Sequence, residues 1–186
     1  PSGAVSIPDY DMAGVEAYQE DSFTVAPGNF LHAVKFRRSI RSYKDMPVSR
    51  DVLERIMEAG RYTATAKNAQ ACTFVAVQTR FQEFKELFWS EFPYILEALK
   101  ETKPEYVRAF TRFYEKWKKD PKADTFFFNA PCLLITAADN PLDGGLVAAN
   151  MENMAVAEGA GVLYSGYLQR TISVSPKLME WLGLDG

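Results

Sequence analysis

Residues 35–45, KFRRSIRSYKD, gather five cations around the hydroxyl group of Ser39. Within this run, Arg37 and Arg38 can each give forked, charge-assisted hydrogen bonds to a phosphate, and Ser39 adds a hydroxyl donor. Arg41 follows four positions after Arg37. Because the whole chain has a formal net charge of -3, this local positive charge fits a small anionic ligand better than a nucleic acid. The same pattern is also common at the solvated end of a helix.

A second segment, TATAKNAQA at 63–71, gathers hydroxyl and amide side chains. It offers Thr65, Lys67, Asn68 and Gln70 on a connection without an apolar anchor. Side-chain amides pair a donor with an acceptor, which suits the edge of a ring that alternates N–H and C=O groups. The alternative is an ordinary connection between a helix and a strand, built from turn-forming residues.

A third segment, GAGVLYSGY at 159–167, is rich in glycine. Glycine lets a ligand or a neighbouring strand approach the backbone closely. The segment is not a G-x-G-x-x-G motif that follows a strand, so it does not predict a dinucleotide-binding fold. Taken singly, each of the three segments is a weak signal.

The hydrophobic pattern predicts the elements that hold these segments. We expect an extended arm over 1–29, and Ser49 as the N-cap of a helix whose buried side includes Leu53 and Gly60. The many aromatic side chains between 80 and 119 are assigned mainly to core and subunit packing. This order of elements favours an α+β fold, with a small sheet wrapped in helices. The other predicted helices span 30–37, 80–100, 104–119, 142–160 and 174–184, and the predicted strands span 73–78 and 131–138, the second fully buried.

Composition excludes several classes of protein. The chain has 186 residues and 47% hydrophobic residues, which suits one domain with a substantial core. His32 is its only histidine, and Cys72 and Cys132 are too far apart for ligand spacing, so no metal site is predicted. The most apolar stretch, 131–138, is too short to span a bilayer, and no early segment has the pattern of a signal peptide. We therefore expect a cytoplasmic protein without a membrane partner.

Taken together and in this order, the three segments resemble the nitroreductase family of FMN-dependent oxidoreductases. The likeness runs from about Phe30 to Leu184 and is clearest over 37–77, 129–138 and 144–167. It implies a nitroreductase-like fold in which a small central sheet is surrounded by helices. It also implies an intertwined homodimer with FMN at the interface between subunits. On this basis the FMN-binding domain is expected over 30–186, after an N-terminal arm or linker over 1–29.

The resemblance assigns the basic run to the cofactor. Arg37, Arg38 and Ser39 match the family's contacts to the FMN phosphate and ribityl chain. Arg41 matches the cation held near the flavin N1 and the C2 carbonyl. A cation at that position stabilises negative charge on the reduced ring and so promotes hydride acceptance.

The other two segments receive roles by the same resemblance. Thr65, Ala66 and Asn68 match the loop that reaches the flavin from the second subunit, and Gln70 of the same stretch completes the predicted contacts. A further part of the cofactor site is expected where the backbone lies along the flavin near N5. This part comprises Tyr164, Ser165 and Gly166. No side chain is assigned as a catalytic acid.

The resemblance predicts that small electrophiles such as nitroaromatics or quinones are reduced by a ping-pong route. NAD(P)H, or an iron–sulfur domain fused to the chain, would supply the electrons. A second hypothesis is a flavin-binding or sensing module without turnover. Dehalogenation and flavin breakdown are further activities that the family resemblance leaves open.

The chain also departs from the family pattern. Ala71 and Cys72 stand where the family often has proline and tryptophan, which changes the wall expected to face the substrate. The family usually continues beyond the last helix with another strand and a basic phosphate contact, so we expect a C-terminal truncation or a missing tail after residues 181–186. The first six residues, PSGAVS, are similar to those that follow the last cysteine of a ferredoxin motif, which suggests an iron–sulfur domain ahead of the chain.

Overall fold

The computed structural model describes residues 18–19 and 23–184. Contacts between residues divide the chain into two units, Pro1–Phe36 and Arg37–Gly186. The PSGAVS stretch, on which the iron–sulfur hypothesis depends, lies outside the described residues. That hypothesis therefore stays a prediction.

The first unit contains helix α2, Pro27–Phe36. Residues 27–29 were predicted to belong to the extended arm, but they form the first turn of this helix. Proline suits that position because its fixed φ is helical and a first-turn N–H has no partner within the helix. The apolar side chains Phe30, Leu31 and Val34 were predicted to share one face, and each is about half exposed within its unit.

The second unit alternates helices with short strands, as the sequence predicted. No helix among the described residues has the length and apolar character needed to cross a membrane. The elements in chain order are α3 (Arg50–Arg61), η2 (Ala66–Asn68), β1 (Cys72–Val77), α4 (Phe81–Thr102), α5 (Pro104–Lys119), β2 (Leu133–Ala138), α6 (Pro141–Ala157), α7 (Gly166–Ile172) and α8 (Pro176–Trp181).

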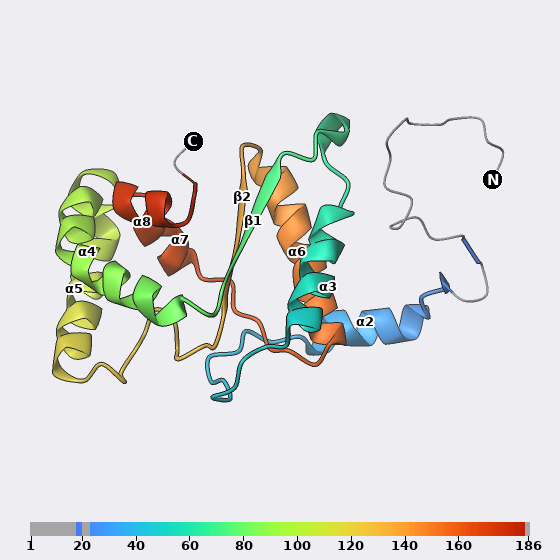
Figure 1. Ribbon diagram of the computed structural model, residues 1–186, viewed down its shortest axis with the longest axis horizontal. Helices are drawn as coiled ribbons and strands as arrows, with labels where there is room; N and C mark the ends of the chain where they lie inside the picture. The colour runs from blue at the N-terminus through green and yellow to red at the C-terminus, as the bar shows by residue number, and fades with distance from the viewer. Residues whose placement is uncertain (1–17, 20–22, 185–186) are drawn as a thin grey trace. The chain divides into compact units, whose positions relative to one another are not determined.

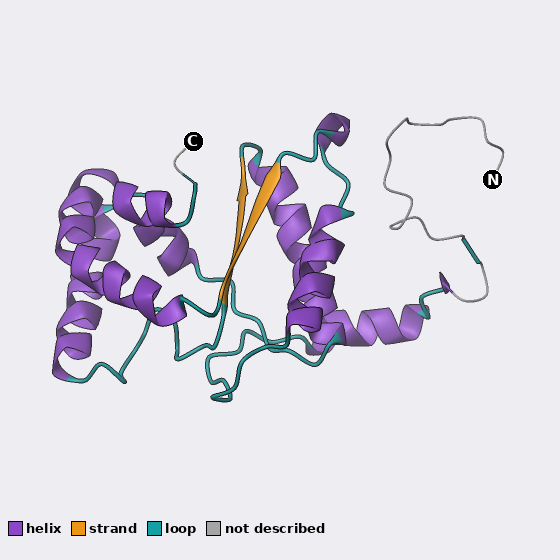
Figure 2. Ribbon diagram, viewed as in Figure 1, coloured by secondary structure: helices purple, strands orange, loops and turns teal. Residues whose placement is uncertain are grey.

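Strands β1 and β2 pair antiparallel, in a register that places Val75 opposite Ile135 and Phe74 opposite Thr136. Successive side chains of a strand point to opposite faces, and both faces are covered by helices. The sheet separates the pair α3 and α6 from the group α4, α5, α7 and α8 (Figures 1 and 2). The prediction that the second strand is fully buried is wrong: all six residues of β2 are partly exposed, because its outer edge is unpaired in the described chain.

One face of the sheet packs on an aromatic core. Phe84, Phe88 and Phe92 follow one another at every fourth position of α4, so they share one side of the helix, and all three are fully buried. Phe88 and Phe92 contact the ring of Phe126 in tilted and edge-to-face arrangements, and Phe126 in turn meets Phe110 edge to face. Phe126 and Phe110 are also buried. The assignment of the aromatic side chains to the core is therefore confirmed.

The other face packs on α3 and α6. Ser49 caps α3 by accepting the N–H of Val52, as predicted. Ile56 and Met151 are among the residues buried between the helices and the sheet. A Cβ on Gly60 would lie 2.9 Å from the Met151 Cγ atom, so the glycine lets α3 and α6 approach closely. This pair of helices supports every segment that the sequence identified as chemically interesting.

Candidate functional site

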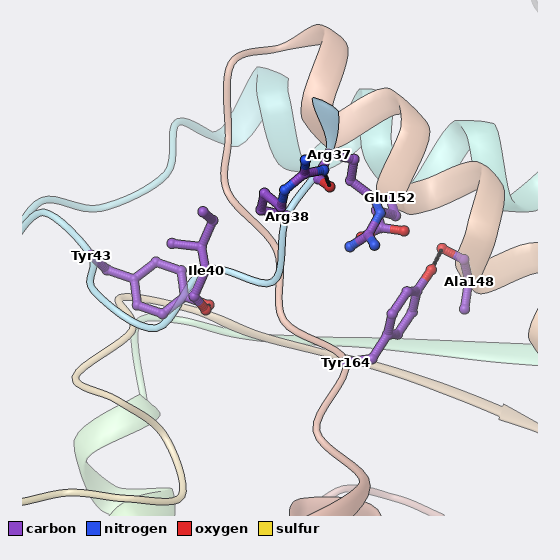
Figure 3. Close-up of polar contacts among 7 residues, drawn as sticks. All are labelled: Arg37, Arg38, Ile40, Tyr43, Ala148, Glu152 and Tyr164. Carbon is purple, nitrogen blue, oxygen red and sulfur yellow. Dashed lines mark hydrogen bonds and ion pairs between the residues drawn. The ribbon is translucent and has the colours of Figure 1, made fainter. Parts of the chain in front are cut away.

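Beyond Lys35 and Phe36, which lie in α2, the basic run has no regular secondary structure, and Ile40 fixes its centre. The Ile40 N–H donates to the carbonyl of Val162 at 3.0 Å. The Tyr43 hydroxyl donates to the Ile40 carbonyl at 2.8 Å, and both of these residues are drawn in Figure 3. A Cβ on Gly161 would lie 2.7 Å from the Ile40 Cγ1 atom. The glycine of the third predicted segment therefore lets the first segment dock against it.

On one side of this anchor, Arg37 reaches α6. Its Nη1 atom lies 3.2 Å from the Oε1 atom of Glu152, and Glu152 is only 9% exposed. Beside this ion pair, the Tyr164 hydroxyl donates to the carbonyl of Ala148 at 2.7 Å (Figure 3). Arg37 and Tyr164, predicted from separate segments, are thus brought together by one helix.

The phenol of Tyr164 is kept in its protonated form by this environment. The pKa of Tyr164 is raised to about 12, chiefly by burial and also by the negative charge of Glu152, while Arg37 opposes the shift. The phenol therefore keeps its proton, and remains a hydroxyl donor, to higher pH than an ordinary tyrosine does. This electrostatic coupling between a helix and a glycine-rich segment was not predicted from the sequence.

The remaining polar residues of the basic run face solvent. Arg38, Ser39 and Arg41 are exposed, and Arg38 donates from Nη1 to the Arg37 carbonyl at 2.8 Å. The run therefore has a backbone held by Ile40 and exposed cations on both sides of that anchor. Such an arrangement can receive an anion without moving the chain.

The loop with the second predicted segment has an unusual backbone. Lys67, Asn68 and Gln70 have φ values of 56°, 53° and 51°, in the left-handed region that residues other than glycine rarely adopt. Each such residue costs on the order of 1–3 kcal/mol and persists only where surrounding contacts enforce it. One such contact is internal, since the Gln70 N–H donates to the Thr65 hydroxyl at 2.9 Å.

Further contacts come from α6. The Ala66 N–H donates to the Oδ1 atom of Asp143 at 3.1 Å, and the Asn150 amide donates to the Thr63 hydroxyl at 2.8 Å. Sequence reasoning missed Asp143, Asn150 and Glu152. One signal could have found them: they are polar residues within a helix otherwise rich in small and apolar ones.

The predicted segment at 164–166 lies where irregular chain becomes α7. The hydroxyl of Ser165 accepts the Leu168 N–H at 3.2 Å, so it serves as the helix N-cap. The carbonyl of Gly166 accepts a hydrogen bond from Arg170 at 2.6 Å, and a Cβ on this glycine would lie 2.5 Å from the same guanidinium. Ser165 and Gly166 therefore have structural roles, and their predicted contact with the flavin stays a prediction.

An apolar cavity of about 370 Å³ adjoins this segment. Five consecutive residues of β2, Leu133–Ala137, line it, so it follows the open edge of the strand rather than one face of the sheet. Glu152, Tyr164 and Ser165 also line the cavity, but neither the basic run nor the loop at 63–70 does. The candidate site is therefore the surface around the basic run, and Glu152 and Tyr164 also border the cavity.

The basic run and the loop contact α6 at different places. Glu152 follows Asp143 by nine positions, which at 100° per residue places the two side chains on opposite faces of the helix. The same spacing separates them by about 14 Å along the helix axis. In Figure 1, η2 lies beyond one end of the pair α3 and α6, and the start of the second unit lies near the other end. Within one chain, the structure does not bring these two predicted segments together.

Comparison with known proteins gives consistent results. The model of the nitroreductase family matches residues 34–186. An NADPH-dependent oxidoreductase of Staphylococcus aureus (strain MRSA252) is 27% identical over 150 residues, covering 79% of this chain and 57% of that protein. The chain thus spans little more than half the length of the curated relatives that it matches.

Solved structures show the same fold. A nitroreductase with bound FMN from Bacteroides fragilis NCTC 9343 has a TM-score of 0.64 and 22% identity, covering 84% of this chain and 79% of that one. A nitroreductase with bound FMN from Desulfitobacterium hafniense DCB-2 has a TM-score of 0.64 and 21% identity, with coverage of 83% and 80%. These likenesses confirm the predicted α+β architecture.

Proposed function

The chain belongs to the nitroreductase family, as its resemblance predicted, and from this premise we propose that it is an FMN-dependent oxidoreductase. In the proposed reaction, electrons from NAD(P)H reach a small electrophile, such as a nitroaromatic or a quinone, by a ping-pong route. The relatives support this proposal by their names, since one is an NADPH-dependent oxidoreductase and two were solved with FMN.

The observation that carries the proposal is the contact between the basic run and the segment before α7. The bond from Ile40 to Val162 aligns the two backbones, and Arg37 then reaches Glu152 beside Tyr164. The resemblance assigns these two segments to different parts of one FMN molecule. Their proximity in the fold supports a shared ligand.

The residues of the basic run fit FMN in charge and exposure. The side chain of Arg37 is 37% exposed, and its guanidinium has five N–H donors, of which one contact to Glu152 is described. With the exposed Arg38 and Ser39, it would hold the phosphate and the ribityl chain. Arg41 would lie beside the ring and favour negative charge there. Bound FMN would supply the hydride-accepting chemistry, while the protein supplies binding, orientation and electrostatics.

The separation of the two predicted segments supports a homodimeric site. The loop at 63–70 and the basic run contact opposite faces of α6 at positions about 14 Å apart along its axis. If both serve one ring, as the resemblance implies, the loop of one subunit would complete the site of its partner. We therefore propose that each FMN is bound by residues of two copies of the chain.

The proposal is tested with purified protein in the absence of oxygen. Protein that binds FMN should show flavin absorbance, NADH or NADPH should bleach it, and a nitroaromatic or a quinone should restore it. Initial rates at several acceptor concentrations should give parallel double-reciprocal lines, as a ping-pong route requires. Size-exclusion chromatography with light scattering measures the oligomeric state.

Other outcomes would decide against parts of the proposal. Flavin absorbance that neither nicotinamide bleaches would favour the binding or sensing module. Protein that stays colourless after FMN is added and then removed from solution by dialysis would rule out the flavoprotein itself. FMN bound tightly by a monomer would contradict the shared site.

A further inference from the structure

We propose that Asp143 is a positioning residue, which holds the loop at 63–70 in the conformation that presents its exposed side chains to the cofactor. The inference rests on the proposed function, because the loop's ligand is taken to be FMN. Nothing in the family resemblance assigned a role to Asp143.

The loop has a conformation that its own residues do not favour. Lys67, Asn68 and Gln70 all have positive φ values, and none of them is glycine. Their side chains are exposed, so burial of these side chains does not impose this conformation. Hydrogen bonds to the loop backbone must therefore do so.

Asp143 supplies such a bond from a rigid position. Asp143 is only 7% exposed. Its Oδ1 atom accepts the N–H of Ala66, the first residue of η2, at 3.1 Å. The carboxylate lies in the first turn of α6, a helix that packs against α3 and the sheet. A bond to a charged acceptor is stronger than one to a neutral acceptor, so this contact is suited to oppose backbone strain.

A second contact fixes the start of the loop on the same face of α6. Asn150 follows Asp143 by seven positions, which returns to within about 20° of the same direction around the helix. Its amide donates to the Thr63 hydroxyl at 2.8 Å, and that hydroxyl donates to the Ala59 carbonyl at 2.9 Å. The loop is thus held at Thr63 and at Ala66, before the first residue with positive φ.

A second role of Asp143, stabilisation of α6 itself, must be distinguished experimentally from its contact with the loop. Acidic residues in the first turn stabilise a helix by interacting with its dipole, whatever they contact outside it. Asn140 provides a matched control, because its side chain caps α6 by accepting the Leu142 N–H at 3.0 Å and has no described contact with the loop. Asn140→Ala weakens the start of α6, whereas Asp143→Ala also removes the bond to Ala66.

The conservative variant Asp143→Asn distinguishes the effect of the hydrogen bond from the effect of the charge. It removes the charge but keeps an oxygen that can accept the Ala66 N–H. If the hydrogen bond matters, Asp143→Asn should behave much more like the wild-type protein than Asp143→Ala does. If only the charge at the helix end matters, the two variants should be equally impaired.

The first measurement follows the loop without any ligand. Hydrogen–deuterium exchange of peptides covering 63–70 should accelerate by about tenfold or more in Asp143→Ala, the effect expected from losing a bond to a charged group. Tryptic cleavage after Lys67 should accelerate in parallel. Asn140→Ala should leave both rates close to those of the wild-type protein, even if its melting temperature falls.

The second measurement is FMN affinity, by quenching of flavin fluorescence on titration. Asp143→Ala should raise the dissociation constant about tenfold, with little change in Asn140→Ala. Unchanged exchange over 63–70 in Asp143→Ala would overturn the inference, as would equal loss of affinity in Asp143→Ala and Asn140→Ala. Wild-type protein that binds no FMN would overturn the proposed function and the link to the cofactor, whereas the exchange rates would still decide whether Asp143 holds the loop.

Discussion

The guanidinium of Arg37 lies 3.2 Å from the carboxylate of Glu152, across 115 positions of the chain. This contact ties the basic run to the middle of α6, and the bond from Ile40 to Val162 ties it to the segment that follows the helix. A feature that is ordinary surface charge in the sequence is thereby placed beside Tyr164. Four predictions test what this arrangement does.

Replacing Arg37 with alanine should impair both cofactor binding and stability. Loss of a charged donor to the phosphate should raise the FMN dissociation constant by about 10- to 100-fold, the equivalent of about 1.5–3 kcal/mol. The buried Glu152 would also lose its described cationic partner, which should lower the free energy of unfolding by about 1–3 kcal/mol. Fluorescence titration and urea unfolding measure the two effects.

Lys44 is the matched control for that experiment. It belongs to the same basic run and is exposed, so Lys44→Ala removes the same charge without removing the contact to α6. Its effects on FMN affinity and stability should be small, since isolated surface charges contribute little. Equal losses in Lys44→Ala and Arg37→Ala would mean that the run acts only through its total charge.

Replacing Arg41 with alanine should affect electron transfer more than binding. This exposed side chain is proposed to stabilise negative charge near the ring rather than to hold the phosphate. Stopped-flow measurement without oxygen should show that flavin reduction by NAD(P)H slows about tenfold or more, while FMN affinity changes less. Arg41→Lys, which keeps the charge, should recover part of the rate. Losses of rate and affinity that match in size would contradict the role.

Replacing Gly161 with alanine should displace the basic run. The new Cβ would lie 2.7 Å from the Ile40 Cγ1 atom, and overpacking of this kind costs about 1–3 kcal/mol. FMN affinity should fall as well, because Ile40 anchors the cations. Adding Ile40→Ala removes the nearest atom and should restore part of the stability. Differential scanning calorimetry and FMN titration check both effects.

Gly145 provides the comparison for this prediction. It lies in α6, and a Cβ there would meet nothing within 4 Å. Gly145→Ala should therefore stabilise the protein by up to about 1 kcal/mol through helix propensity, without a change in FMN affinity. If Gly161→Ala also leaves stability and FMN affinity intact, the close contact with Ile40 does not position the basic run for FMN binding.

Stability should fall at alkaline pH because of Tyr164. Its pKa is about 12 in the folded protein and about 10 in an unfolded chain, so folding favours the neutral phenol. The resulting stabilisation is complete below about pH 10 and is lost as the pH rises towards about 12. Because the residue is 52% exposed, solvent screening should keep the loss well below the full value of the shift.

Urea unfolding at a series of pH values between about 9 and 11 measures this effect. Tyr164→Phe should lose less stability over that interval than the wild-type protein does. Glu152→Gln removes a charge that raises the pKa of Tyr164, so the loss, which begins near the pKa of the unfolded chain, should be smaller than in the wild-type protein. A pH dependence that is the same in Tyr164→Phe and in the wild-type protein would contradict the assignment.

Much of the fold could be predicted because it depends on local patterns. Ser49 precedes the apolar positions of α3, and the phenylalanines of α4 recur at helical spacing, so both elements follow from short-range rules. The partial exposure of β2 could not be predicted in this way. It depends on which strands pair, and the apolar sequence LLITAA is the same for a central and an edge strand.

In the candidate site, too, some residues could be predicted from local sequence and others depend on packing. The donors of the basic run could be identified because charge is visible in the sequence. The partners that position them could not, since Glu152 and Asp143 resemble the solvent-facing residues of an ordinary helix. Only the packing of α6 against α3 and the sheet buries these carboxylates and gives each of them one defined contact.

Helix α6 makes two distant contacts depend on the number of residues between them. One residue inserted between Asp143 and Glu152 would turn one carboxylate relative to the other by about 100° and shift it by about 1.5 Å. The loop and the basic run could then not both keep their bonds. Seven inserted residues would restore the direction to within about 20° but would add about 10 Å of length. This stretch of the chain should therefore accept many substitutions and almost no insertion or deletion.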